Sequence, residues 1–354
     1  MKIGIFDPYL DDLGGGERYM MTIAKCLAQE NEVFVFWDNK ADLKNIEKRF
    51  SLDLSKVKLT KNIFDGKTPY FNKIKNSANY DRIIFLSDGS IPFLLSKKVL
   101  LHIQQPITAA FPSAKDKIKL RRISKIFCNS KYTKKFVDSV YGAQSELLYP
   151  PVSIYGISEK KENIILHVGR FRVMNVKAKD YKKQRFMIET FKQMVDDGLK
   201  NWEFVLGVSL PDEKNEDFLE MREKAKGYPV KFLINADKDE LWRLGSKAKI
   251  YWHASGFGED LDKYPELAEH FGISTVEAMG IGAVPVVINA GGQIEIVEDG
   301  ENGFLWNNVQ EFTAKTLKLV NDIKLLESMS KKAYQRSLEF SDDSFCQKVK
   351  ALVK

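Results

Sequence analysis

The alternation of short β-rich runs with longer amphipathic segments is the feature that most constrains how this chain can fold. In the first half, six such runs are bounded by turn residues: Lys2–Phe6, Glu32–Trp37, Arg82–Leu86, Val99–Ile103, Lys125–Cys128 and Glu146–Tyr149. The stretches between them are long enough for helices. Strands that alternate with helices form parallel sheets, because each helix carries the chain back to the edge where the next strand starts. The pattern therefore predicts a doubly wound α/β domain.

The same pattern restarts after Pro150 and Pro151, since consecutive prolines cannot continue a helix or a central strand. Five more runs follow: Asn163–Val168, Glu203–Gly207, Val230–Ile234, Lys249–Trp252 and Ala283–Val287. The length of 354 residues suits two α/β domains of about 150–200 residues each. The sequence predicts Rossmann-like domains over residues 1–152 and 153–338, and a C-terminal helix over 339–354 that can pack back on the first domain. Ligands are expected in a cleft between the domains, beyond the carboxyl ends of the strands.

Composition narrows the class of protein further. No apolar run approaches the ~20 residues needed to span a bilayer, and the N-terminus lacks the features of a signal peptide, so a cytoplasmic protein is expected. The three cysteines (Cys26, Cys128 and Cys346) are widely spaced, and each is expected to be a small buried hydrophobe without a disulfide partner. The net charge of +7 favours anionic partners, but no nucleic-acid-binding module accompanies it, so nucleic acid is not expected as a partner.

The first candidate site is the glycine-rich segment Gly14–Arg18, which follows the first strand and precedes a helical run. Glycines at a strand-to-helix turn let backbone amides approach an anion at the positive end of the helix. The spacing matches neither of the common nucleotide-binding glycine motifs. Equally well, this segment could serve only as the structural start of the helix, without binding a ligand.

A basic segment follows the first strand of the second half. It comprises Arg170, Arg172, Lys177, Lys179, Lys182, Lys183 and Arg185. Positive side chains after a strand end could neutralise a diphosphate, although most charge runs are simply solvated surface. Arg170 is the strongest candidate, because it comes directly after the apolar strand and should point into the cleft.

The most specific segment is Glu269–Gly280, in which two glutamates, Glu269 and Glu277, are separated by seven residues. A helix is expected to start near Ser274, with Gly272 allowing a tight turn in front of it. One carboxylate could then reach a sugar and the other a ribose, with phosphates at the helix N-terminus. Ser274 and Glu277 also fit a capping box, which is a purely structural device of equal weight. Downstream, the paired Gly291 and Gly292 could offer further amides, whereas residues 299–303 look like an ordinary turn.

Together these motifs resemble the retaining glycosyltransferases of family 4, the glycosyl transferases group 1, which have the GT-B fold. The resemblance runs in order along nearly the whole chain, through Gly14–Arg18, Cys128–Thr133, Tyr149–Val152, Gly169–Phe171 and Glu269–Met279. The glutamate pair with seven residues between is the most specific motif. The forms of the first and last motifs look most like α-mannosyltransferases of glycan assembly.

The resemblance implies a role for each matching residue. The diphosphate of the donor would be held by Gly15 and Gly16 amides and by Arg170 and Lys182, and Lys182 is preferred because residues 182–184 look like the family's Lys-x-Gln. The ribose hydroxyls would be held by Glu277. The transferred sugar would be held by Glu269 and by the backbone of Phe271, Gly272 and Ile273.

The implied reaction transfers a hexose, such as mannose, from a GDP- or UDP-sugar, with retention and without a metal or other cofactor. The site would stabilise the leaving nucleotide diphosphate while the acceptor hydroxyl attacks the same face. His102 is expected to contact the sugar beside Glu269, whereas counting back from Pro106 selects Gln104 instead.

The acceptor is expected to be a glycan or lipid-linked, as in polysaccharide or glycolipid biosynthesis. Residues 114–135 contain nine Lys or Arg and one Asp, interleaved with apolar residues. This segment predicts a basic amphipathic surface that docks on anionic lipid at the cytoplasmic face of a membrane, and a soluble surface helix is an equal alternative.

Four other functions compete with transfer. A sugar-nucleotide epimerase or a phosphorylase can share the fold, and a product assay separates these from a transferase. A catalytically silent scaffold would have lost the donor residues, but Arg170, Glu269 and Glu277 are all present. A nucleic-acid-binding function rests on net charge alone and predicts salt-dependent binding to generic DNA or RNA.

Overall fold

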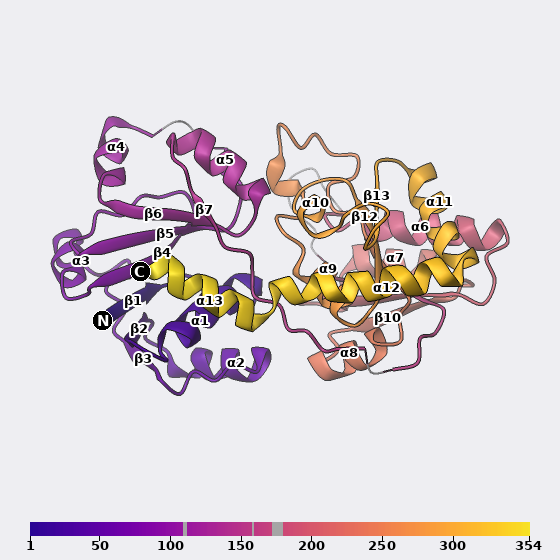
Figure 1. Ribbon diagram of the computed structural model, residues 1–354, viewed down its shortest axis with the longest axis horizontal. Coiled ribbons are helices and arrows are strands. Elements are labelled where there is room, and N and C mark those ends of the chain that lie inside the picture. The colour runs from indigo at the N-terminus through magenta and orange to yellow at the C-terminus, as the bar shows by residue number, and fades with distance from the viewer. Residues whose placement is uncertain (109–111, 158, 172–179) are drawn as a thin grey trace. The chain divides into compact units, whose positions relative to one another are not determined.

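The computed structural model describes residues 1–108, 112–157, 159–171 and 180–354. The chain forms two compact units: an N-terminal unit of residues 1–151 with 340–354, and a C-terminal unit of residues 152–339. Each unit contains one parallel sheet flanked by helices (Figure 1). The predicted class, two doubly wound α/β sheets, is confirmed.

The sheet of the N-terminal unit has seven strands in the order β3-β2-β1-β4-β5-β6-β7. The strands are β1 (Lys2–Phe6), β2 (Glu32–Phe36), β3 (Val57–Thr60), β4 (Arg82–Ser87), β5 (Lys98–Ile103), β6 (Ile123–Cys128) and β7 (Glu146–Leu147). The helices of this unit are α1 (Gly15–Leu27), α2 (Lys40–Phe50), α3 (Tyr70–Ser77), α4 (Ala114–Leu120), α5 (Lys131–Tyr141) and α13 (Asp342–Val353). The sequence missed β3, which is short and only partly buried.

Strand alternation divides the core of this unit into two layers. Ile3 and Ile5 of β1 pack with α1, α2 and α13 on one face, while Phe6 packs with Phe36 and Phe85 on the other. Successive side chains of a strand point to opposite faces, so a strand that is apolar throughout needs cover on both sides. The first layer is aliphatic and helix-covered, whereas the second is rich in aromatic rings.

The C-terminal helix α13 packs on α1 (Figure 1). Cys346 of α13 forms a disulfide with Cys26 of α1. The prediction that these cysteines are unpaired is therefore wrong. The sequence separation of 320 residues gives no local signal, because only the return of the chain to α1 brings the two cysteines together. Cys128 is the free, buried cysteine that the sequence predicts.

The sheet of the C-terminal unit has six strands in the order β10-β9-β8-β11-β12-β13. The strands are β8 (Ile164–Arg170), β9 (Glu203–Ser209), β10 (Val230–Ile234), β11 (Ile250–His253), β12 (Val284–Ile288) and β13 (Phe304–Trp306). The α-helices are α6 (Gln184–Asp196), α7 (Glu216–Lys224), α8 (Lys238–Gly245), α9 (Ile273–Gly280), α10 (Gln293–Ile296), α11 (Val309–Asn321) and α12 (Ile323–Ser337). Two short 3₁₀ helices cover Pro265–Leu267 and Leu338–Phe340.

Each sheet has a switch point, where the chain stops adding strands on one side and starts on the other. It lies between β1 and β4 in the N-terminal unit and between β8 and β11 in the C-terminal unit. In open α/β sheets, ligands bind outside the carboxyl ends of the strands at such a point, because the two connections there run to opposite faces and leave a crevice. Each unit therefore has one position where a ligand is expected.

No helix in the described part of the chain is both long enough and apolar enough to cross a bilayer.

Candidate active site in the C-terminal unit

Three polar side chains meet at the switch point of the C-terminal unit. His253 is the last residue of β11, and its Nε2 lies 3.1 Å from Oε2 of Glu269. Nζ of Lys182 lies 2.6 Å from the same oxygen. The structure thus brings together two residues singled out in the sequence, Lys182 and Glu269, and adds a third, His253.

The charge state of this cluster follows from its burial. Burial opposes ionisation of Glu269, but Lys182 and His253 outweigh it and hold the pKa of the carboxyl well below its ordinary value. Burial lowers the pKa of His253, so its ring is neutral near pH 7. Since a carboxylate can only accept hydrogen bonds, Nε2 of His253 carries the proton and donates it to Glu269.

The backbone turns sharply after Glu269. Gly272 has a φ of +120° and caps α9, which begins at Ile273. A Cβ at Gly272 would lie 2.7 Å from Nε2 of Gln293, so a larger residue fits neither the angle nor the space. The tight turn predicted at Gly272 is confirmed, and α9 begins directly after it.

The capping-box interpretation of Ser274 and Glu277 is wrong. The N-cap of α9 is Gly272, and the Ser274 hydroxyl instead pairs with the Tyr251 hydroxyl at 2.8 Å. Glu277 lies in the second turn of the helix rather than the first. Burial raises the pKa of Tyr251, and the charges of Glu269 and Glu277 raise it further, whereas its hydrogen bond with Ser274 lowers it.

The paired glycines, Gly291 and Gly292, pack against the backbone of the loop that carries Glu269. The Gly292 amide donates to the Glu269 carbonyl at 2.7 Å, so it is not available to a ligand as the sequence suggested. A Cβ at Gly292 would lie 2.3 Å from Cα of Phe271, and one at Gly291 would lie 2.3 Å from the Glu269 carbonyl oxygen. No larger residue fits at either position, because two backbone segments are in contact there. Residues 299–303 form the turn that the sequence predicts.

The basic residues after β8 divide into several groups. Arg170 is the last residue of β8, paired in register with Ser209, rather than the first residue beyond the strand. Lys183 pairs with Glu259, and Arg185 pairs with Asp217 and Glu220, so these two stabilise the local fold. Three others, Arg172, Lys177 and Lys179, lie outside the described residues.

Several buried polar atoms around the Glu269 loop have no hydrogen-bond partner among the residues that the structure describes. They are Nδ1 of His253, Oγ of Ser255, Nε2 of His270 and Nε2 of Gln293. Buried polar groups are nearly always paired, because leaving one unpaired costs about 1–3 kcal/mol. Such a cluster is typical of a place where a ligand or ordered water completes the hydrogen bonding.

In the N-terminal unit, Gly14 caps α1, and Gly15 and Gly16 form its first turn. The Glu17 carboxylate accepts a hydrogen bond from the Gly14 amide, as in a structural helix start. Gln104 lies against this turn: its Nε2 donates to the Gly16 carbonyl at 3.4 Å, and a Cβ on Gly16 would lie 2.5 Å from its Oε1. A side chain at position 16 would therefore displace Gln104.

His102 lies inside the sheet of the N-terminal unit, with no exposed surface. Its ring is stacked between Tyr19 and Phe127, with centroids 4.3 and 4.4 Å away. Burial lowers its pKa to about 3, so the ring is neutral. Its Nδ1–H donates to the Phe127 carbonyl oxygen at 3.1 Å. His102 is therefore fully buried, whereas Gln104 is partly exposed.

Sequence reasoning missed His253 and Tyr251. Both belong to β11, which reads as an ordinary buried strand, and neither has a recognisable motif around it. The available signal was position: His253 ends a strand at the carboxyl edge beside the switch point, where polar side chains tend to be functional. His167 of β8 is a buried core residue, and its Nδ1 lies 2.9 Å from the Trp252 carbonyl oxygen.

The chain is similar to several known proteins. It is 27% identical over 219 residues to a GDP-Man:Man(3)GlcNAc(2)-PP-Dol alpha-1,2-mannosyltransferase of Dictyostelium discoideum, a match that covers 58% of this chain and 41% of that protein. It is 26% identical to an alpha-1,4-N-acetyl-D-galactosaminyltransferase of Campylobacter jejuni with an undecaprenol-linked substrate in its name, over 96% of this chain and 94% of that one. Anabaena HepE in complex with UDP shares the fold, with a TM-score of 0.73 at 19% identity, over 100% of this chain and 99% of that one.

The family assignment rests on the C-terminal unit, which holds the Lys182, Glu269 and His253 cluster. Residues 156–336, just over half of the chain, match the family described as glycosyl transferases group 1. The chain spans less than half the length of the Dictyostelium mannosyltransferase. With its sequence match and its two doubly wound sheets, this chain belongs to the glycosyl transferases group 1 family.

Proposed function

We propose that this protein is a glycosyltransferase that moves a sugar from a nucleotide diphosphate-sugar to a glycan or lipid-linked acceptor. The observation that carries the proposal is the cluster of Lys182, Glu269 and His253 at the switch point of the C-terminal unit. This cluster combines an anion-binding cation with a carboxylate that can accept hydrogen bonds from sugar hydroxyls. The Lys182 ammonium and the Glu269 carboxylate, 2.6 Å apart, can together bind a ligand in which a phosphate is linked to a sugar.

The proposed roles follow the chemistry of each residue. Lys182 and Arg170 hold the diphosphate, with the Gly15 and Gly16 amides as further donors to it. Glu277 holds the ribose hydroxyls. Glu269 holds the transferred sugar, together with the backbone of Phe271, Gly272 and Ile273. The N-terminus of α9, which Gly272 opens, adds a positive helix end near the developing charge.

The reaction proposed is transfer with retention and without a metal ion. The acceptor oxygen bonds to the anomeric carbon on the face that the diphosphate leaves, the carbon–oxygen bond to the phosphate breaks, and the hydroxyl proton passes to the departing phosphate oxygen. Lys182 and Arg170 stabilise the charge that develops on that phosphate, the electrostatic contribution that usually dominates such catalysis. Neither a metal nor another cofactor is part of this proposal.

For the sugar contact from the N-terminal unit, we favour Gln104 over His102. Gln104 is partly exposed beside Gly16, whereas His102 has no exposed surface and is enclosed by two rings. A role for His102 in contacting the sugar would require Tyr19 or Phe127 to move.

Mannose carried by GDP is the proposed donor, with a UDP-sugar as the alternative. The name of the Dictyostelium relative contains GDP-mannose, and Anabaena HepE has been solved with UDP. The names of the Dictyostelium and Campylobacter relatives contain diphosphate lipids, which supports a lipid-linked acceptor in glycolipid or polysaccharide biosynthesis, as for family 4 enzymes. The protein would then act in the cytoplasm, as a peripheral protein on an anionic membrane.

Titration calorimetry with GDP, UDP and ADP tests the donor site on the wild type and on Lys182→Met. We expect one nucleotide diphosphate to bind, with an affinity about tenfold or more lower in Lys182→Met, because the cation that neutralises the phosphate is gone. Lys200→Met, at an exposed position of the same unit, is the matched control and should bind like the wild type. Wild-type protein that binds no nucleotide diphosphate at millimolar concentration would contradict the proposal.

A product assay with the preferred sugar nucleotide separates transfer from the competing activities. Transfer gives a free nucleotide diphosphate and a glycosylated acceptor, whereas an epimerase returns an isomeric sugar nucleotide and a phosphorylase a sugar phosphate. Added EDTA should leave the rate unchanged if no metal takes part. The anomeric configuration of the product, read by NMR, tests retention.

A further inference from the structure

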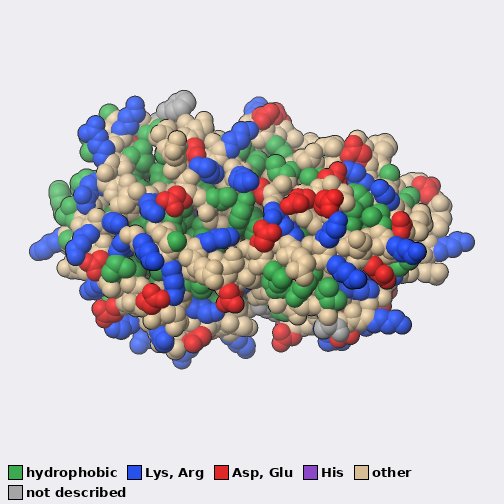
Figure 2. All heavy atoms as spheres, viewed as in Figure 1, with side chains coloured by type: hydrophobic (Ala, Val, Ile, Leu, Met, Phe, Trp, Pro, Cys, Tyr) green, Lys and Arg blue, Asp and Glu red, His purple; other side chains and the backbone are tan. Residues whose placement is uncertain are grey.

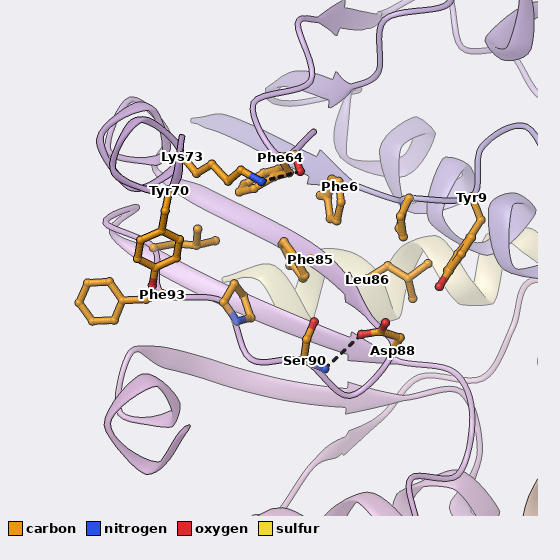
Figure 3. A pocket seen from close by; sticks show the side chains of 13 residues that line it. Phe6, Tyr9, Phe64, Tyr70, Lys73, Phe85, Leu86, Asp88, Ser90 and Phe93 are labelled. Atoms are coloured by element: carbon orange, nitrogen blue, oxygen red, sulfur yellow. Dashed lines mark hydrogen bonds between the residues drawn. The ribbon is translucent and has the colours of Figure 1, made fainter. Parts of the chain in front are cut away.

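The switch point of the N-terminal unit also carries a pocket, and nothing described above uses it. Its volume is about 380 Å³, within the range of ~300–1,000 Å³ typical of small-molecule sites (Figure 3). Phe6 of β1 and Phe85 of β4 come from the two strands that flank the switch point, and Tyr9 and Asp88 come from the loops that follow these strands. The pocket therefore lies where open α/β sheets bind ligands.

The floor of the pocket consists of three phenylalanine rings. The centroid of Phe6 lies 4.8 Å from that of Phe64 and 4.6 Å from that of Phe85, and the Phe64 and Phe85 centroids are 5.4 Å apart. Figure 3 shows these three side chains lying between Tyr70 and Tyr9. Packed against one another, the rings form a rigid apolar surface rather than a set of mobile side chains.

The rim of the pocket differs from its floor because it can form hydrogen bonds. Tyr9 and Tyr70 lie on opposite sides in Figure 3, and they are 47% and 56% exposed. Neither tyrosine hydroxyl bonds to any residue in the described part of the chain. Asp88 and Ser90 lie on a third side, held to each other by a hydrogen bond of 3.2 Å from the Ser90 amide to the Asp88 carboxylate.

Lys73 of α3 completes the rim and fixes the helix over the floor. Its Nζ donates to the Phe64 carbonyl at 3.1 Å (Figure 3). The α3 helix is further tied to the 91–96 loop by the bond from the Leu95 amide to the Ser77 hydroxyl at 2.8 Å. The pocket is thus a built feature, with walls from two strands, one helix and three loops.

We propose that this aromatic switch-point pocket binds a pyranose ring of the acceptor. A pyranose is amphipathic: its C–H faces carry a small positive charge that suits the negative face of an aromatic ring, and its edge carries hydroxyls. An aromatic floor with a rim of tyrosine, aspartate, serine and lysine matches both parts. The inference rests on the proposed transferase function, because an acceptor is needed only if the protein transfers a sugar.

An isoprenoid chain is the competing occupant, and the rim argues against it. Hydrocarbon in the pocket would cover Asp88 and the hydroxyls of Tyr9 and Tyr70 without pairing them, and each polar group buried in this way costs about 1–3 kcal/mol. A sugar hydroxyl can replace the water that each of these groups loses. The chemistry of the rim therefore selects a sugar over a lipid tail.

Saturation-transfer difference NMR on the full chain tests this proposal with three probes. The probes are methyl α-mannopyranoside, methyl 2-acetamido-2-deoxyglucopyranoside and farnesyl phosphate. We expect the ring C–H protons of at least one glycoside to receive saturation from the wild type. Tyr70→Ala and Tyr9→Ala should each lower the affinity for that glycoside about tenfold, because each removes one stacking or hydrogen-bonding wall of the pocket.

Phe71→Ala is the matched control, because Phe71 neighbours Tyr70 on α3, is 81% exposed and does not line the pocket. It should bind the glycoside like the wild type. Nucleotide diphosphate affinity, measured on the same samples, should be unchanged in all three variants. An increase in acceptor KM for Tyr70→Ala, with little change in kcat, would locate the effect at substrate binding.

The outcomes separate this proposal from the donor-site proposal. If nucleotide binds but no glycoside receives saturation, or the signal survives both tyrosine substitutions, the pocket proposal is overturned and the donor site stands. Stronger saturation of farnesyl phosphate than of either glycoside, lost in Tyr9→Ala, would overturn it in favour of a lipid site. If no nucleotide diphosphate binds, the transferase function itself fails, whatever the sugars do.

Discussion

At the scale of single residues, burial decides the charge states on which the proposed chemistry depends. Glu269 stays ionised although it is largely enclosed, because Lys182 and His253 supply a cation and a donor within 2.6 and 3.1 Å of one oxygen. Lys182 in turn is already paired with the Glu269 carboxylate before any ligand binds. A diphosphate that binds Lys182 must therefore compete with Glu269, and the ion pair sets the distance between the phosphate and sugar positions.

Glu269→Gln separates these two roles. The amide oxygen can still accept from His253, but the charge that neutralises Lys182 is removed, so nucleotide diphosphate should bind as tightly as to the wild type or more tightly. Transfer should fall about 10²-fold, because the contact to the sugar is weakened in the transition state. Calorimetry and the transfer assay on one preparation measure both quantities. A variant that loses nucleotide affinity and transfer in parallel would contradict this division of roles.

A second residue-scale effect concerns Asp7, which follows β1 and has no exposed surface. Burial, with a smaller contribution from Glu17, raises the pKa of Asp7 from 3.8 to about 8. The folded state therefore binds this proton more tightly than the unfolded chain does. The contribution of Asp7 to stability is fully present below pH 4 and is lost as the pH rises from about 4 to 8.

Asp7→Asn should abolish this pH dependence, since asparagine resembles the protonated acid and does not titrate. At pH 8 the variant should be more stable than the wild type by roughly 3 kcal/mol, and at pH 5 the difference should be much smaller. Urea unfolding at the two pH values measures the change. Equal stability gains at both pH values would show that Asp7 does not hold a proton in the folded state.

At the scale of elements, the Glu269 loop depends on glycines that belong to another segment. Gly291 and Gly292 precede α10 and touch the backbone of residues 269–271, so the donor loop and the start of α10 form one packed unit. The Gly292 amide donates to the Glu269 carbonyl, so it points into the protein rather than toward a ligand. These glycines are thus structural partners of the site.

Gly292→Ala tests this packing. The new Cβ would lie 2.3 Å from Cα of Phe271 and 2.5 Å from the His270 carbonyl oxygen, and backbone cannot move aside as a side chain can. The variant should lose about 3 kcal/mol of unfolding free energy and most of its nucleotide affinity. Gly66→Ala, where nothing lies within 4 Å of the new Cβ, is the control and should change stability by less than about 0.5 kcal/mol. Similar stabilities for the two variants would mean that the loop relaxes easily.

The α13 helix is the element whose position the sequence constrains least. Its residues Phe345, Val349, Leu352 and Val353 are buried in the core with α1, and the disulfide from Cys346 to Cys26 fixes the contact covalently. Disulfides are uncommon in cytosolic proteins, so the state of this pair bears on the compartment expected from the sequence.

Reduction should lower the unfolding free energy by about 2–5 kcal/mol, because the crosslink restricts the unfolded chain. α13 should nevertheless stay docked, since its apolar face remains buried. Urea unfolding with and without dithiothreitol measures the loss. The Cys26→Ala/Cys346→Ala protein is the control and should not respond to the reductant; a wild type that also fails to respond would mean that the pair is already reduced.

At the scale of the whole molecule, the charge is divided unequally between the two units. The N-terminal unit has 28 Lys and Arg against 18 Asp and Glu, a net charge of +10, and the C-terminal unit has 27 against 30, a net charge of −3. Figure 2 shows many of the basic side chains spread over the displayed face of the N-terminal unit. The excess positive charge of the chain therefore belongs to one unit alone.

The basic segment of residues 114–135 does not form the amphipathic surface that the sequence predicts. Ile126 and Phe127 lie in β6 and are buried, so they cannot form the apolar face of a surface helix. Only the short helix α4 presents an exposed apolar residue, Ile118, among lysines. Any membrane contact by this segment would therefore be mainly electrostatic.

Co-sedimentation with vesicles tests that contact. The wild type should bind phosphatidylglycerol vesicles but not pure phosphatidylcholine vesicles, and 0.5 M salt should remove the binding, since screening shortens the reach of surface charge to a few ångströms, about 3–5 Å. Lys115→Gln/Lys117→Gln on α4 should bind about 30-fold less, at ~1 kcal/mol per lysine. Lys226→Gln/Lys231→Gln in the C-terminal unit is the control. Binding that is independent of lipid charge would contradict membrane docking through this surface.

The sequence by itself determined the two doubly wound sheets, most of their strands and the segments that hold Lys182, Glu269 and Gly272. These features are local: apolar periodicity defines a buried strand, and turn residues define its ends. The missed strands β3 and β13 are short, with four and three residues, too few for a periodic signal.

Only the tertiary structure decided which distant residues meet. The disulfide joins residues 320 apart, His253 reaches Glu269 because β11 ends beside the loop, and Phe6, Phe64 and Phe85 form one floor from three separate segments. His102 has a site-like sequence context, yet two rings that are remote in sequence enclose it. The physical reason is the same in each case: burial, pairing and pKa depend on neighbours supplied by other elements, and a single sequence carries no record of those neighbours.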